Sequence, residues 1–233
     1  MWDKVDDALK RKIGTIQKNA KLSNLAHQYA EGLFREFPEA TCALDYSNPL
    51  ELLVATILSA QCTDERVNKV TPALFAAYKT AAEYAASPKG EMEDYVKSTG
   101  FFNSKAKAIR SACADIAAKF DGEVPEAIED LLTLRGVARK TANVVRTHCF
   151  DYPGLTVDTH FKRLTHRMGL TKSTDPAKIE QEIAALLPPE RWTHFSSAII
   201  LHGRKTCKAR KPDCIACQFA SMCPRNEPSK LQP

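Results

Sequence analysis

Apolar residues recur along most of this chain at spacings of three and four, which is the period of one face of an α-helix. Leu25, Tyr29 and Leu33 form one such face, and Pro38 follows the end of the run. No stretch of the sequence alternates apolar and polar residues as a half-buried β-strand does. The sequence therefore predicts an all-α fold.

Helix boundaries are predicted where capping residues adjoin these apolar runs. Asn48, Pro49 and Glu51 have the arrangement of an N-cap, a first-turn proline and a capping-box partner. A second helix is expected from residue 104 towards residue 120. A third opens at Asp175 and Pro176 and stops at the proline pair 188–189.

Length and composition allow one sizeable core or two modest lobes, since the chain has 233 residues of which 44% are hydrophobic. Residues 1–20 carry mixed charges and few core residues, so we expect a partly ordered N-terminal arm. Pro153 and Gly154 are the best candidates for an internal boundary. Residues 226–233, which contain two prolines, are expected to form a tail.

The sequence contains neither a secretory signal nor a segment of transmembrane length, so we expect a cytoplasmic protein, nucleoid-associated in a prokaryote, without a membrane partner. The formal net charge of +5 has the sign that a nucleic-acid partner requires. Eight cysteines in a reducing compartment indicate metal binding and burial more than disulfides. Four of them lie in apolar helical segments and are expected to pack in the core: Cys42, Cys62, Cys113 and Cys149.

The other four cysteines have the spacing C-x6-C-x2-C-x5-C, and they are Cys207, Cys214, Cys217 and Cys223. Four thiolates this close would repel one another unless a metal centre neutralised them. Structural zinc usually draws on two short cysteine pairs, and only one is present here. An iron–sulfur cubane also takes four cysteines and suits longer spacers. The spacing favours a [4Fe-4S] cluster, with zinc as the alternative.

Five basic residues surround the first of these cysteines: Arg204, Lys205, Lys208, Arg210 and Lys211. A charge run of this kind is often only a solvated surface. Beside a cross-linked loop, however, it forms a preformed surface for the phosphates of DNA, because each phosphate contact releases condensed counterions. We therefore expect these residues to contact the DNA backbone.

The segment LLTLRGVARKTANVV joins two helical runs through a short turn that contains Gly136, as in a helix-hairpin-helix element. The N-terminus of the second helix favours a phosphate. Lys140 lies in its first turn, where the helix dipole, Arg139 and partial burial would favour the neutral, nucleophilic amine. The alternative is a surface lysine lying along a phosphate. Asp158, in TVDTHFKRL, is placed as the N-cap of the next helix.

These motifs together resemble the endonuclease III family, which shows L-P-G-V-G-R-K-T-A-N-V-V, V-D-T-H and the same C-terminal cysteine spacing. The resemblance covers residues 21–225. It implies a six-helix barrel at 42–152 that contains the hairpin, and a cluster domain formed by 21–41 and 153–225. It further implies that Lys140 is the nucleophile and Asp158 the catalytic carboxylate, facing each other across a cleft.

The resemblance also implies residues that read the damaged strand. An enzyme that acts on a base in a duplex must flip it out and fill the gap. Gln61, in SAQCTD, is the candidate for this role, and its alternative is a surface glutamine. Phe101, in GFFNSK, takes the place of the family's leucine wedge. His160 is expected near the backbone, and the hairpin is expected to bind DNA through Gly136, Ala138 and Arg139.

Two departures from the family pattern fall in the hairpin, where Arg135 replaces a proline and Ala138 a glycine. The methyl group of Ala138 would hold a phosphate off, and it would add strain if the site needed positive φ. Arg135 loosens the turn, although its charge recovers some attraction. We expect these changes to weaken the grip on DNA.

The sequence thus predicts a monomeric bifunctional DNA glycosylase that removes oxidised pyrimidines and cleaves abasic sites by β-elimination, on double-stranded DNA containing damaged pyrimidines or abasic sites. One alternative is an adenine-glycosylase relative, but that branch lacks the lysine found at 140. The other is a DNA-binding damage or redox sensor with little or no catalysis, which Phe101, Arg135 and Ala138 would suit.

Overall fold

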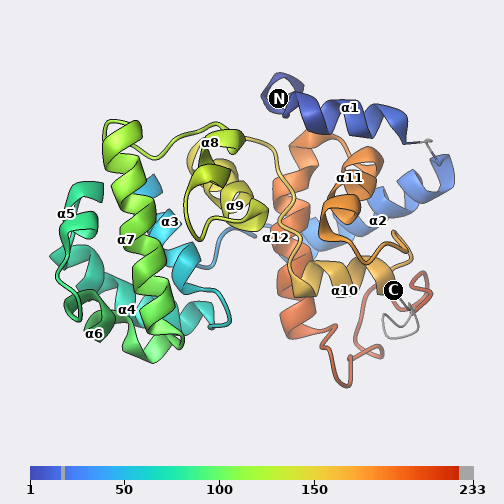
Figure 1. The fold of residues 1–233 in the computed structure, drawn as a ribbon. Helices are drawn as coiled ribbons and strands as arrows, with labels where there is room; N and C mark the ends of the chain where they lie inside the picture. Colours follow the sequence, from blue (N-terminus) through green and yellow to red (C-terminus); the bar gives the residue numbers. More distant parts are fainter. Residues whose placement is uncertain (17–18, 226–233) are drawn as a thin grey trace. The chain divides into compact units, whose positions relative to one another are not determined.

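The computed structural model describes residues 1–16 and 19–225 of the chain. Within these ranges it contains twelve α-helices and two short 3-10 helices and has no β-strand (Figure 1). The predicted all-α fold is confirmed. None of the helices in this part of the chain combines the length and the apolar character needed to cross a bilayer.

The chain divides into two compact units. One is the continuous unit, Cys42–Asp151, and the other is the discontinuous unit, formed by Met1–Thr41 together with Tyr152–Pro233. The assignment of residues 42–152 as a six-helix barrel stays a prediction. The tail expected at residues 226–233 lies outside the described residues.

The continuous unit is built around α3, in which every residue from Leu52 to Leu58 is buried. Asn48 caps this helix as expected, since its side chain accepts a hydrogen bond from the Glu51 amide at 2.9 Å. The helices α4, α7 and α9 pack against it. The elements of the unit are α3 (Pro49–Leu58), α4 (Asp64–Ala77), α5 (Ala81–Ala86), α6 (Glu91–Val96), η2 (Lys97–Thr99), α7 (Phe102–Lys119), α8 (Ile128–Thr133) and α9 (Arg139–Cys149).

The long helix α7 presents an apolar face to this core, and α5 lies along it (Figure 1). Ala106, Ile109 and Ile116 are fully buried on that face. Cys113 is buried among them, and Cys42, Cys62 and Cys149 pack against the same core, as the sequence predicts.

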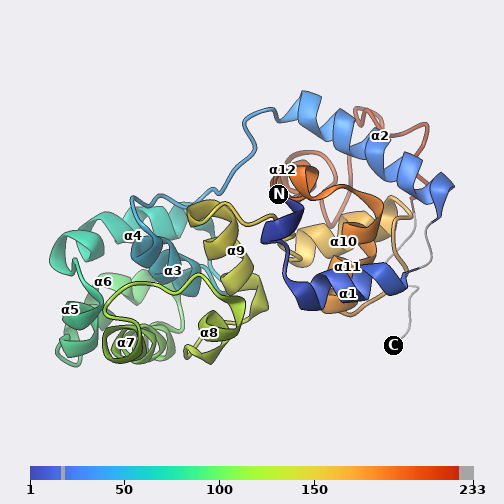
Figure 2. The same cartoon turned by 90° about the horizontal axis from the view of Figure 1, so that it is seen from above.

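The discontinuous unit brings together helices from both ends of the sequence. Figure 2 shows α2 beside α12, and the two are in contact. Trp192, Phe195 and Ile199 of α12 are buried in the core of the unit. Its elements are η1 (Trp2–Lys4), α1 (Asp7–Thr15), α2 (Ala20–Glu36), α10 (Thr159–Arg167), α11 (Pro176–Leu186) and α12 (Pro189–Lys205), followed by a loop at residues 206–225.

The N-terminal segment differs from the partly ordered arm that the sequence suggests. Val5 and Leu9 are only 4% and 5% exposed, and α1 packs against α11. The Trp2 ring meets that of Trp192 edge-on, with 6.5 Å between centroids. These few apolar residues are too sparse to form a periodic pattern, so their place in the core depends on tertiary packing.

Candidate functional site

The hairpin comprises residues 134–140, between α8 and the first turn of α9. Gly136 has φ +81°, and a Cβ atom added there would lie 2.8 Å from the Cβ of Ala108 on α7. Leu134 and Val137 are 2% and 6% exposed on either side of it. Glycine is therefore needed at 136 both for the backbone conformation and for the close approach to α7.

Lys140 is the second residue of α9 and is exposed to solvent. The partial burial expected from the sequence is therefore not found. The N-cap of this helix, Ala138, makes no side-chain capping bond in the described structure, so it leaves the first-turn amides to other partners. The N-terminal end of α9 thus keeps the features of an anion site, with the Lys140 amine beside it.

Ala138 adopts an extended backbone, with φ −91° and ψ 169°. An alanine takes this conformation without strain, so the strain considered for a positive φ at this position does not arise. Arg135 is exposed. Both departures from the family pattern are accommodated by the fold, and only the effect of the Ala138 methyl group on an incoming phosphate stays a prediction.

Asp158 is the N-cap of α10, as the sequence predicts. Its Oδ1 accepts a hydrogen bond from the Phe161 amide at 2.7 Å, and the side chain is half-buried. The carboxylate is therefore fixed by its own helix. His160 lies two residues further on, with Nδ1 3.3 Å from Nη2 of Arg163. Burial lowers the pKa of His160, and the cations Arg163 and Arg204 add to this while Asp158 opposes it.

Gln61 and Phe101 share an unusual backbone conformation. Their φ angles are +52° and +49°, in the left-handed region that side-chain-bearing residues rarely occupy. Gln61 is exposed in the turn after α3, and Phe101 immediately precedes α7 with 67% of its surface exposed. Their roles in filling the gap left by a flipped nucleotide stay predictions.

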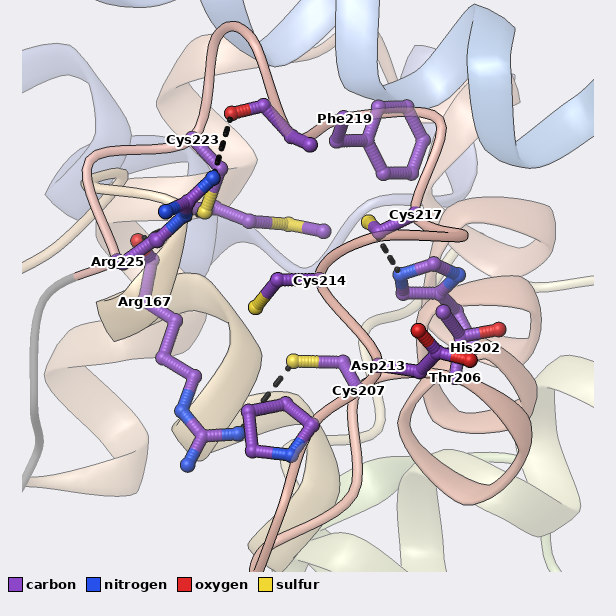
Figure 3. A pocket seen from close by; sticks show the side chains of 13 residues that line it. Arg167, His202, Thr206, Cys207, Asp213, Cys214, Cys217, Phe219, Cys223 and Arg225 are labelled. Atoms are coloured by element: carbon purple, nitrogen blue, oxygen red, sulfur yellow. Dashed lines mark hydrogen bonds between the residues drawn. The ribbon is translucent and has the colours of Figure 1, made fainter.

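The four clustered cysteines line one cavity of about 110 Å³ in the discontinuous unit. Figure 3 shows their side chains arranged around a common space, with Arg167 on one side and His202 on another. Nη1 of Arg167 lies 3.5 Å from the Cys207 sulfur, and Nε2 of His202 lies 3.6 Å from that of Cys217. Among the described residues, no three Cys, His, Asp or Glu side chains converge closely enough to bind a single metal ion.

The cysteine thiols are electrostatically unfavourable neighbours. Burial raises the pKa of Cys217 and of Cys223, and the nearby thiols raise it further. A bound metal centre reverses this effect, because its positive charge stabilises the thiolates. The donor set of this cavity therefore suits a metal centre.

Two arginines on α10 hold the loop that carries these cysteines. Nη2 of Arg163 donates to the carbonyls of Gly203 and Cys207, at 2.9 and 2.8 Å. Arg167 donates to the carbonyls of Lys208 and Ala209, at 2.8 and 3.0 Å. Neither arginine was among the site residues predicted from the sequence. Their separation by one helical turn was the available signal, but it does not by itself distinguish a buried pair from a solvated one.

The same loop is anchored to α2 by an aromatic ring and a polar network. Phe219 is 3% exposed and packs on Gly32, where any Cβ atom would overlap its ring. Glu36 accepts a hydrogen bond from Gln218 at 2.8 Å and lies 2.9 Å from Nδ1 of His202. The helix α2, which lies far from the cysteine loop in the sequence, is therefore part of the platform that supports this loop.

The five basic residues predicted to contact DNA are exposed at the end of α12 and in the loop: Arg204, Lys205, Lys208, Arg210 and Lys211. Lys205 places its ammonium 5.5 Å above the ring of Phe37. Exposed cations on a loop that is tied down at several points form a surface suited to phosphates. Their contact with DNA stays a prediction.

Comparison with known proteins gives consistent matches over most of the chain. The family model for HhH-GPD superfamily base excision DNA repair proteins matches residues 54–189. Endonuclease III of Synechocystis sp. is 54% identical over 215 residues, which are 92% of this chain and 98% of that protein.

Two solved structures are also similar. A non-covalent endonuclease III–DNA complex superposes with a TM-score of 0.83 and 39% identity, over 86% of this chain and 94% of the other. A trapped endonuclease III–DNA covalent intermediate has the same TM-score and identity, over 86% and 95%.

Proposed function

The chain belongs to the endonuclease III family of HhH-GPD base-excision DNA repair proteins, and from this we propose that it is a bifunctional DNA glycosylase and abasic-site lyase. Its substrate is double-stranded DNA that contains oxidised pyrimidines or abasic sites. We place its action in the cytoplasm, and in a prokaryote with the nucleoid.

The observation that carries this proposal is the position of Lys140. Its exposed amine stands in the first turn of α9, directly after a hairpin that Gly136 presses onto α7. The covalent protein–DNA intermediate of a 39% identical relative supports a chemistry in which the protein itself bonds to DNA. The N-terminus of α9 also suits this chemistry, because its free N–H groups and the positive dipole end attract the phosphate next to the reacting sugar.

The reaction begins when the neutral amine of Lys140 attacks C1′ of the damaged nucleotide. A bond forms between nitrogen and C1′, and the bond from C1′ to the base breaks, with its electron pair leaving on the base. The nitrogen then loses a proton and forms a second bond to C1′ while the C1′–O4′ bond breaks and O4′ takes up a proton, which opens the sugar and gives a protonated Schiff base. Its positive charge acidifies the C2′ proton, so removal of that proton expels the 3′ phosphate oxygen and cuts the strand on its 3′ side.

Asp158 is the proposed carboxylate of this reaction, stabilising positive charge on the sugar and accepting a proton. The N-cap bond to Phe161 supports such a role, because it fixes the carboxylate before the substrate arrives. Gln61 and Phe101 are proposed to fill the gap left by the flipped nucleotide. Their exposure and left-handed backbone support this. His160 is proposed to lie near the backbone of the damaged strand.

A [4Fe-4S] cluster is the proposed cofactor, held by Cys207, Cys214, Cys217 and Cys223. A cavity of about 110 Å³ among four thiols fits a polynuclear centre, in which each cysteine binds a different iron. Single zinc requires all its sulfur ligands within about 2.3 Å of one point. When bound, the cluster supplies a cross-link between the four ligands, and this holds the basic residues of the loop towards DNA.

Borohydride trapping on abasic duplex tests the proposal directly, because reduction of a Schiff base leaves a stable protein–DNA adduct. We expect the native protein to form the adduct and Lys140→Ala to lose it while still binding DNA. The matched control is Lys89→Ala, which removes an exposed lysine elsewhere in the continuous unit. An equally abundant adduct in Lys140→Ala would exclude Lys140 as the nucleophile. Absence of both adduct and strand cleavage in the native protein would favour a damage sensor.

A further inference from the structure

Lys105 is a buried lysine whose charge is met by backbone carbonyls. It lies in the first turn of α7 and is only 6% exposed. Its ammonium donates to the carbonyl of Leu58 at 2.8 Å and to that of Thr99 at 2.8 Å. Burying an ammonium group costs free energy unless it is hydrogen-bonded. A buried, hydrogen-bonded lysine is therefore expected where its bonds fix a backbone conformation that the protein needs.

The two carbonyls belong to different elements, and each stands at the end of one. Leu58 is the last residue of α3, and Thr99 is the last residue of η2. The C-terminal carbonyls of a helix carry partial negative charge and lack helical partners, so a cation suits them. Lys105 therefore joins the ends of two elements that are about 40 residues apart in the sequence. Chain connectivity alone does not fix the distance in space between two such ends.

Both of these ends lead directly into the proposed gap-filling residues. Gln61 follows Leu58 after two residues, and Phe101 follows Thr99 after one. The main-chain amide of Lys105 also donates to the carbonyl of Phe101 at 3.0 Å. One residue thus bonds to the segment before Gln61, to the segment before Phe101, and to Phe101 itself.

The backbone of these two turns needs such support. Gln61 and Phe101 both have positive φ, a strained conformation that persists only where the surroundings over-determine it. Neither side chain is buried, so packing of the side chains does not hold them. The hydrogen bonds from the Lys105 ammonium instead restrain the backbone just before each turn, at the carbonyls of Leu58 and Thr99.

We propose that Lys105 is a positioning residue that sets the separation of Gln61 and Phe101, and thereby the protein's preference for a gapped or abasic site over intact duplex. The inference rests on the proposed roles of Gln61 and Phe101. The part of the substrate that Gln61 and Phe101 meet is the gap in the DNA duplex opposite an unpaired base. Phosphate contacts made elsewhere on the protein are independent of Lys105.

The test measures dissociation constants for two duplexes, one with a tetrahydrofuran abasic analogue and one undamaged, by fluorescence anisotropy. Lys105→Met keeps an unbranched side chain and removes the donor. We expect it to reduce the preference for the abasic duplex about tenfold, with affinity for undamaged duplex unchanged. Lys107→Met, at an exposed position of the same helix, is the matched control and keeps the native preference.

A double-mutant cycle separates positioning from a general structural effect. In the Gln61→Ala/Phe101→Ala background, Lys105→Met should change the preference by less than about twofold, because nothing remains to be positioned. A full tenfold loss in that background, or an unchanged preference in Lys105→Met alone, overturns the inference. If Gln61→Ala/Phe101→Ala keeps the native preference, the proposed gap-filling roles fail and the inference fails with them.

A second variant covers the case in which Lys105→Met does not fold. The shorter amide of Lys105→Gln can reach one of the two carbonyls, so an intermediate preference is expected. Thermal unfolding of each variant accompanies the titrations. A preference in folded Lys105→Gln equal to that of the native protein also counts against the role of Lys105.

Discussion

The hairpin and the cysteine loop are both proposed to meet DNA, and the structure holds them in opposite ways. The hairpin, residues 134–140, has Leu134 and Val137 buried beneath it and Gly136 pressed onto Ala108. The loop, residues 206–225, packs Phe219 and Met222 against the core of the discontinuous unit and is otherwise held through hydrogen bonds and the four thiols.

The two surfaces are therefore made rigid by different interactions. A hairpin with a core under it keeps its shape through burial of apolar area, which needs no added component. A loop held largely by hydrogen bonds gains little net stability from each of them. We therefore expect the loop to depend on its proposed metal centre, and the hairpin to need none.

The largest expected effect comes from removing one cluster ligand. Cys214→Ala should lose iron and lower the free energy of unfolding by about 4 kcal/mol or more, because metal binding contributes directly to the stability of such a loop. Hydrogen exchange should show loss of protection at residues 206–225 and retained protection at the hairpin. Cys42→Ala, a cysteine packed against the other core, should retain iron. If the loop amides stayed protected in iron-free protein, the loop would not need a metal centre, and the contrast with the hairpin would be wrong.

The hairpin should be sensitive to volume instead. Gly136→Ala adds both a strained φ and an overlap with Ala108, so we expect a loss of about 3 kcal/mol in urea unfolding. Gly122→Ala isolates the first contribution, since Gly122 has φ +84° with nothing within 4 Å of its added Cβ, and should cost about 1 kcal/mol. Equal losses in the two variants would mean that α7 yields to the added methyl group.

A smaller effect is expected from the arginine beside the cluster. Arg167→Met removes the bonds to the carbonyls of Lys208 and Ala209 and the contact with the Cys207 sulfur. Water can replace the carbonyl bonds, so the stability loss should be about 1 kcal/mol, with iron retention against a chelator about tenfold lower. Arg210→Met removes an exposed charge from the same loop and should lower DNA affinity without loss of iron. Equal iron retention in both variants would remove Arg167 from its supporting role.

The smallest effect is expected where the hairpin departs from the family pattern. Ala138→Gly has no strain to relieve at φ −91°, and Leu134 already has the extended backbone that a following proline requires. The double variant Ala138→Gly/Arg135→Pro should therefore tighten binding to abasic duplex by no more than about threefold. Single-turnover cleavage should rise by a similar factor. Weaker binding would show that the charge of Arg135 compensates for the lost geometry.

Local signals predicted the parts of the fold that depend on neighbouring residues. The cap at Asn48 and the N-cap role of Asp158 each involve a partner three residues away, so they were visible in the sequence. The cysteine spacing and the flanks of Lys140 were equally local. The family resemblance then supplied the expected roles, which geometry within one unit supports but does not test.

The contacts that the sequence did not predict join distant residues. Lys105 meets Leu58 across 47 positions, and Arg163 meets Cys207 across 44. Gln218 reaches the Gly32 carbonyl across 186. Nothing near Lys105 or Arg163 indicates which carbonyl each side chain will meet, because the pairing exists only after the helices have packed. Burial of charged residues is for this reason the feature least accessible to pattern analysis.

The pairing of α2 with α12 has a consequence for the order of synthesis. The continuous unit holds its whole core between residues 42 and 151, so it can fold as soon as that stretch has left the ribosome. The helix α2 emerges earlier, yet its partner α12 follows after roughly 150 further residues, a wait of about 8–30 s at typical elongation rates. During that interval the apolar face of α2, with Tyr29 and Leu33, is exposed on the nascent chain. A newborn molecule therefore passes through a stage in which one half is native while the other is a candidate for chaperone binding.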